Sequence, residues 1–144
     1  MNRRIEAMFQ AIPLTRFMGI TLLDERDDGL ILGAPLHLNV NDKGTAFAGS
    51  LSALIQVTGW ELWRYWLEQT VTESYAVAAV DVHIHYQKPV ISDFQARAIL
   101  PAERNELLST LLKRGRCKVE TMISVRDKEG EKAQARVSYA LLRR

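Results

Sequence analysis

The sequence has few residues of the kinds that build a metal centre, a disulfide staple or a nucleic-acid surface. Its single cysteine, Cys117, can form no disulfide within the chain, and that cysteine and the three histidines lack the spacing of zinc ligands. We therefore expect no metal. The formal net charge of +2 is small and evenly spread, so it predicts no nucleic-acid partner. The first residues, MNRRIEAMFQAIP, contain no apolar run of signal-peptide length, so a cytoplasmic location is expected.

The length and composition are those of an ordinary globular domain. With 144 residues, of which 47% are hydrophobic and 25% charged, the chain is long enough to bury one core without metals or disulfides. No repeat or linker divides it. Residues 1–144 are therefore expected to form a single domain.

The longest apolar segment predicts a helix enclosed by the rest of the chain. It follows a loop rich in capping and turn residues, begins near Ala48 to Ser50 and runs through Leu67. Its apolar residues cover most of the circumference, which is typical of a buried helix. Gln56, Glu61 and Arg64 interrupt the run, so a membrane span is not expected.

Six strands and two shorter helices are predicted around this segment. The alternation is clearest from Tyr75 to Pro89, where Val80, Val82, Ile84 and Tyr86 should form a buried face opposite Asp81, His83 and His85. The other expected strands are Phe17 to Arg26, Leu30 to Leu38, Phe94 to Leu100, Lys118 to Arg126 and Lys132 to Leu142. Short helices are expected over residues 3–11 and around Leu107 to Leu112, the second ending at Gly115.

The resulting order, β-β-α-β-β-β-β, predicts an α+β fold with an antiparallel sheet curled around one long helix. This order, with the GTAFAGSLSAL junction, HYQKPV and GRCKVETMISVRD, resembles the hot-dog fold of acyl-thioester enzymes. More closely, nearly the whole chain resembles the thioesterase domain at the C-terminus of YiiD-like acetyltransferase proteins. These residues include no counterpart of the acetyltransferase half, so acetyl transfer is not expected.

The start of the central helix is the candidate catalytic position. Unpaired N–H groups there point outward at the positive end of the helix dipole, where they can bind a thioester oxyanion. We assign this contact to Gly49, together with Ala48 or Ser50; the alternative is that Gly49 only packs or caps the helix. In many hot-dog thioesterases a histidine and a helix carboxylate complete the site, and the resemblance places Phe47 and Gln56 at those positions.

Because that carboxylate is missing, the acid or base must come from elsewhere. Asp42 is our candidate base or nucleophile, and Asp81 could come from a neighbouring subunit. Asn39 and Asn41 could orient water or substrate. The alternative for Asp42, Asn39 and Asn41 is a purely structural role in turns and caps.

Serine and histidine chemistry receives less support from the sequence. Ser50 and Ser52 lack a triad pattern and are better explained as capping or packing residues. His83 and His85 share a strand face with Asp81, which would suit a metal pair or the acid–base chemistry of a hot-dog dehydratase or isomerase. A hydrated face or a subunit contact is the commoner explanation of two such histidines.

Substrate contacts can be assigned to an apolar and a basic group. The apolar set could line an acyl tunnel or be core: Phe47, Leu51, Leu54, Trp60, Trp63 and Tyr86. The basic set could meet the phosphates of coenzyme A or an acidic carrier protein, or simply be solvated: Lys113, Arg114, Arg116 and Lys118. Cys117 lies in this basic setting, which could lower its pKa, but it is treated as structural.

The resemblance also implies an assembly. The strand from Ala79 to Lys88 is the expected edge along which two copies pair, giving a homodimer or a dimer of dimers whose sites are shared between subunits. The reaction would be hydrolysis of an acyl-coenzyme A or acyl carrier protein thioester with no cofactor beyond the substrate's own carrier group. A non-catalytic acyl-thioester-binding module is the alternative, since the helix carboxylate is absent.

Overall fold

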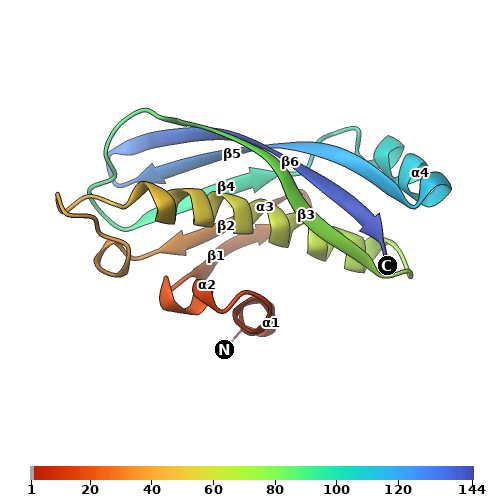
Figure 1. Cartoon of the computed structure of the whole chain (residues 1–144), viewed down its shortest axis with the longest axis horizontal. Helices are drawn as coiled ribbons and strands as arrows, with labels where there is room; N and C mark the ends of the chain where they lie inside the picture. Colours follow the sequence, from red (N-terminus) through yellow and green to blue (C-terminus); the bar gives the residue numbers. More distant parts are fainter. Residues whose placement is uncertain (1) are drawn as a thin grey trace.

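The structure, a computed structural model, describes residues 2–144 and consists of one antiparallel sheet with a long helix on one face (Figure 1). In sheet order the strands are β1 (Thr21–Arg26), β2 (Gly29–Ala34), β4 (Phe94–Ile99), β5 (Arg116–Asp127), β6 (Gly130–Arg143) and β3 (Tyr75–Tyr86). The helices are α1 (Arg3–Ala11), α2 (Leu14–Phe17), the 3₁₀ turn η1 (Leu36–Leu38), α3 (Ala48–Thr70) and α4 (Arg104–Arg114). The predicted α+β class and strand order are confirmed.

Two predicted boundaries were wrong in the N-terminal β-hairpin, formed by β1 and β2. The first strand begins at Thr21 because the residues from Leu14 to Phe17 form α2 instead. The second ends at Ala34 because Pro35, which has no N–H to donate to a neighbouring strand, leads into η1.

The central helix α3 is fixed to the sheet by close contacts in its middle. Trp63 is fully buried, and its indole Nε1 donates a 2.7 Å hydrogen bond to Thr121 Oγ1 on β5. Tyr139 of β6 crosses the helix at Gly59, where any Cβ would collide with the tyrosine ring. The hydroxyl of Tyr139 donates to the carbonyl of Gln56 at 2.7 Å. Glycine at position 59 therefore sets how closely α3 lies against the sheet.

An N-terminal helical pair, α1 and α2, covers a second side of α3, away from β5 and β6 (Figure 1). Its apolar residues Ile5, Met8 and Phe9 are buried. Glu61 of α3 is 1% exposed, pairs with Arg4 of α1, and accepts a 2.8 Å hydrogen bond from Arg64. This buried carboxylate is neutralised by two guanidinium groups, which ties α1 to the central helix.

The two edges of the sheet differ. Strand β1 is short, contains an irregularity after Leu22 and ends in charged residues. Strand β3 is twelve residues long and pairs only with β6 among the described strands. The predicted burial of its apolar face was wrong within one chain, since Val80 is 53% and Val82 is 36% exposed. A long edge with exposed apolar side chains is a surface suited to pairing with another strand.

Candidate functional site

The start of α3 presents two backbone N–H groups without acceptors. Phe47 is the N-cap residue and provides no side-chain cap. Its carbonyl accepts hydrogen bonds from the N–H groups of Ser50 and Leu51, at 2.9 and 3.1 Å. The N–H groups of Ala48 and Gly49 have no hydrogen-bond partner within residues 2–144. At the positive end of a 23-residue helix, these two donors can receive a developing negative charge.

Phe47 and Tyr86 flank this helix start. Phe47 is 56% exposed, and its ring lies so close to Gly49 that a Cβ there would collide with it. The hydroxyl of Tyr86, at the end of β3, donates to the carbonyl of Ala48 at 3.2 Å. Partial burial raises the pKa of Tyr86, which favours the protonated, donating form. The predicted residues Phe47, Ala48, Gly49, Ser50 and Tyr86 are therefore gathered at one place.

The loop before α3 is held by two asparagines whose hydrogen bonds are structural. Asn41 Oδ1 accepts from the N–H groups of Lys43 and Thr45 at 2.8 and 3.1 Å, and its Nδ2 donates to Thr45 Oγ1 at 2.8 Å. Asn39 is buried, and its Nδ2 donates to the carbonyls of Met18 and Pro35. The Oδ1 of Asn39 is buried without a hydrogen-bond partner within residues 2–144. The hydrogen bonds that the two amides do make shape the loop, which favours the structural alternative for them.

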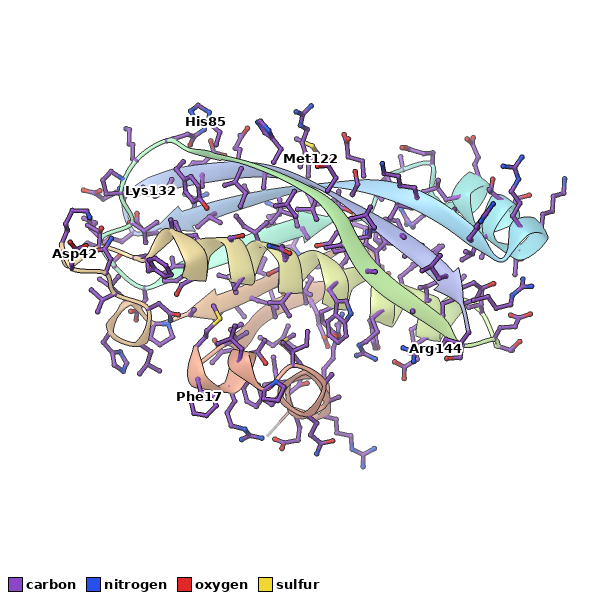
Figure 2. The ribbon with its side chains drawn as sticks, in the orientation of Figure 1. Phe17, Asp42, His85, Met122, Lys132 and Arg144 are labelled. Carbon is purple, nitrogen blue, oxygen red and sulfur yellow. The ribbon has the colours of Figure 1, made fainter. Side chains whose placement is uncertain are left out.

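Asp42 lies at the tip of this loop, beyond the start of α3 (Figure 2). Its side chain is 84% exposed and pairs with Lys43 Nζ at 3.0 Å. It is the only acidic side chain between Asn39 and Phe47. The candidate base is therefore solvent-accessible and close in sequence to the free N–H groups.

An apolar cavity of about 320 Å³ lies on the same helix, between α3 and the α1–α2 pair. The structure places Trp60 here, in agreement with a pocket role. The lining consists mainly of apolar side chains from the first eighteen residues and from α3, closed by one residue each of β3 and β6: Ile12, Leu14, Thr15, Met18, Ala53, Gln56, Val57, Trp60, Ala79 and Tyr139.

For most of the apolar set the structure supports the core alternative rather than a tunnel between the helix and the sheet. Leu51, Leu54 and Trp63, assigned to that tunnel, are 4%, 0% and 0% exposed and belong to the core. The contribution of the N-terminal residues was missed. The only signal for it was the apolar spacing of Ile5, Met8, Phe9 and Ile12, which indicates a helix that covers something.

The acidic and histidine side chains of β3 lie on the outer face of the sheet. Asp81, His83 and His85 pair with Ser138, Arg136 and Gln134 of β6, whereas the alternating residues of β6 face α3. His85 points away from α3 (Figure 2). A histidine dehydratase site at the α3 start therefore receives no support within one chain. Residues 2–144 also contain no group of three His, Cys, Asp or Glu side chains suited to a metal.

The basic group lies at the other end of the sheet. Arg116 opens β5 opposite Leu142, whereas Tyr86, which touches the α3 start, lies opposite Ala133. Nine residues of β6 separate these points, about 30 Å at the rise of a strand. Within one chain Arg116 is therefore remote from Gly49. Burial raises the pKa of Cys117, contrary to the lowering that its basic neighbours suggested, and keeps the thiol protonated.

The sheet wrapped around one helix, with free N–H groups at the helix start, defines a hot-dog domain of the thioesterase class. Residues 3–143 match the family described as "Putative thioesterase (yiiD_Cterm)", and the chain belongs to that family. The predicted resemblance is confirmed. No helix within residues 2–144 is long and apolar enough to cross a membrane.

Solved structures with the same fold come from several bacteria. A "putative thioesterase" from Shewanella oneidensis is 28% identical, with a TM-score of 0.84 over 98% of this chain and 96% of that one. A "probable thioesterase" from Pseudomonas aeruginosa is 21% identical (TM-score 0.83; 98% and 94% covered). A thioesterase from Haemophilus influenzae is 18% identical (TM-score 0.73; 96% and 90% covered), and these last two likenesses show the fold alone. The family and the Shewanella structure support thioesterase activity in general.

The structural role of Asn41 predicts that its replacement destabilises the protein more than replacement of its neighbour Asp42 does. Replacing Asn41 by alanine removes three loop hydrogen bonds and should lower the free energy of unfolding by about 1–2 kcal/mol. Asp42→Ala removes only an exposed ion pair and should change it by less than about 0.5 kcal/mol. Urea denaturation of both variants measures the difference. Equal values for the two would contradict the structural role of Asn41.

Proposed function

We propose that the protein hydrolyses the thioester of an acyl-coenzyme A or acyl carrier protein, with the carbonyl oxygen bound by the N–H groups of Gly49 and Ala48. The observation that carries this proposal is the uncapped start of α3, where both donors lack partners within residues 2–144. Water adds to the carbonyl carbon, the oxyanion forms against these donors, and the C–S bond then breaks. The products are a carboxylic acid and the free thiol.

In this proposal Asp42 takes the proton from the attacking water. Its support is its position: it is the one carboxylate of the loop that leads into α3, and it is open to solvent. The proton taken by Asp42 passes to the departing thiolate when the C–S bond breaks. In this mechanism Asn39 and Asn41 shape the loop rather than hold the water.

The working unit in this proposal is a homodimer, or a dimer of dimers, formed by antiparallel pairing of two β3 edges. The exposed Val80 and Val82 on a long edge strand, which pairs with β6 on one side alone among the described strands, support it. Such pairing reverses the second copy, so its Arg116 end lies beside the first copy's α3 start. Arg116 and its basic neighbours could then meet the phosphates of the carrier group. Asp81 stays on the outer face, because a continuous sheet preserves the alternation.

A non-catalytic acyl-thioester-binding module is the second candidate, and one residue favours it. Gln56 stands where related hot-dog enzymes carry a carboxylate, and its Nε2 donates to Ser52 Oγ at 3.0 Å. A neutral amide cannot accept the proton of an attacking water. If Asp42 does not act on the substrate, binding would remain without efficient turnover.

The oxyanion contact predicts loss of turnover when a free N–H is removed without disturbing the helix. Proline has no N–H and fits the first turn of a helix. With acyl-coenzyme A substrates, Ala48→Pro should lower kcat by about 10²–10³, the cost of losing one oxyanion donor, because Ala48 is the first helical residue and follows the extended Phe47. Thiol release measures the rate, and thermal unfolding checks the fold. Arg3→Pro, at the exposed first position of α1, is the matched control, because Asn2 before it is extended. Unchanged kcat in Ala48→Pro would contradict the assignment.

The assignment of the base predicts a second loss of rate. Asp42→Ala should lower kcat at least about 100-fold while leaving stability unchanged, since the side chain is exposed. Asp27→Ala, an exposed aspartate in the turn between β1 and β2, is the matched control. Wild-type turnover that survives Asp42→Ala would remove Asp42 from the mechanism. No turnover by wild type on coenzyme A or carrier-protein thioesters would favour the binding module.

The proposed dimer predicts that a charge on the β3 edge separates the chains. Val82→Lys adds an ammonium group to the surface where the second strand would pair, and should weaken association at least about 100-fold. Sedimentation measures the mass as a function of concentration. Leu112→Lys, on the exposed side of α4, should leave the mass unchanged. A Val82→Lys protein that remains dimeric would show that the copies pair elsewhere.

A further inference from the structure

The cavity between α3 and the α1–α2 pair lies in line with the free N–H groups. Ala53, Gln56 and Trp60 line it and follow Gly49 by four, seven and eleven residues. At 3.6 residues per turn these positions share one face of the helix. At 1.5 Å per residue, Ala53 lies about 6 Å and Trp60 about 16 Å beyond Gly49 along the helix axis. The cavity therefore begins one turn from the proposed oxyanion site.

The polar atoms around the cavity are directed into hydrogen bonds rather than into the space. Thr15 Oγ1 donates to the carbonyl of Ile12 at 2.6 Å, and the Tyr139 hydroxyl donates to the carbonyl of Gln56 at 2.7 Å. Burial raises the pKa of Tyr139, so this hydroxyl keeps its proton. Gln56 Nε2 donates to Ser52 Oγ. The other side chains that line the cavity, among them Met18 and Trp60, are apolar. The cavity therefore suits a hydrocarbon rather than a charged group.

The dimensions of the cavity set the length of that hydrocarbon. An engineered apolar cavity of about 150 Å³ takes up benzene, with six carbons, and this cavity of about 320 Å³ is about twice as large. An extended chain advances about 1.2 Å per bond, so the distance from Gly49 to Trp60 corresponds to about thirteen bonds. An acyl chain of fewer than about six carbons would end before it reaches past Ala53.

We propose that this cavity is the acyl-chain pocket and that it selects straight saturated chains of about eight to twelve carbons. Ala53 forms its entrance on α3 and Trp60 its far end. The segment from Ile12 to Met18, which contains α2, forms its outer wall, so this segment determines specificity as well as stability. The open side lies at Ala79 on β3, where a second copy would cover it. The proposal rests on the proposed function for the position of the thioester.

The test compares Ala53→Phe, which fills the entrance, with wild type on straight-chain acyl-coenzyme A substrates of two to sixteen carbons. Each methylene buried should raise kcat/KM about fourfold. The ratio of kcat/KM for decanoyl- to butanoyl-coenzyme A should therefore fall about 250-fold in Ala53→Phe, the effect of about four methylenes, those beyond the sixth carbon. Trp60→Ala should move the optimum to longer chains. Ala7→Phe, exposed on α1 and outside the lining, is the matched control.

Calorimetric binding of decanoyl- and butanoyl-coenzyme A separates this inference from the proposed function. If wild type binds the longer chain more tightly and Ala53→Phe abolishes that preference, the pocket stands even without turnover, and only the hydrolase fails. If wild type hydrolyses thioesters but neither its chain-length profile nor its binding preference changes in Ala53→Phe, the pocket is overturned while the hydrolase stands. Equal binding of both chains by wild type also overturns it.

Discussion

The contact between Tyr139 and Gly59 determines how the central helix sits in this protein. The tyrosine is fully buried, crosses α3 where there is no side chain, and bonds to the carbonyl of Gln56. This contact and the Trp63–Thr121 hydrogen bond direct one side of α3 into the sheet. The side that carries Gly49, Ala53 and Trp60 is consequently left to the N-terminal helices and to the edge of β3.

Two of the polar residues that interrupt the apolar run of α3 have a structural role. Glu61 and Arg64 join Arg4 in a buried ion group that holds α1 in place, and the segment from Ile12 to Met18 that follows α1 then closes the cavity. Removing one member would leave another charge buried without its partner, which costs far more than a surface pair. The wall of the cavity therefore depends on this ion group, which takes no part in the chemistry proposed for the start of α3.

The sequence was informative where a feature depends on local residues and uninformative where it depends on a partner surface. The start of α3 follows from turn residues and a glycine before an apolar run, and the structure begins that helix at Ala48. The alternation in β3 correctly sorted Val82 from His83. It could not show that the Val82 side is exposed, because burial depends on which strands lie beside β3. Likewise, Ile12 and Met18 carry no local sign that they line a cavity with Trp60.

Because Gln56 is an amide, the rate acceleration that α3 itself can supply is limited. In serine hydrolases, an oxyanion hole and substrate binding alone still accelerate hydrolysis about 10³–10⁴-fold over water. A positioned base adds about 10²–10⁴ more. The uncapped helix start of this chain and its apolar cavity can account for the first factor. The carboxylates of α3, Glu61 and Glu68, cannot supply the second, because they are ion-paired with arginines and lie more than three turns beyond Gly49. An efficient enzyme on this scaffold must therefore obtain its base from outside the helix, which is why the proposed mechanism assigns the base to the exposed loop carboxylate of Asp42.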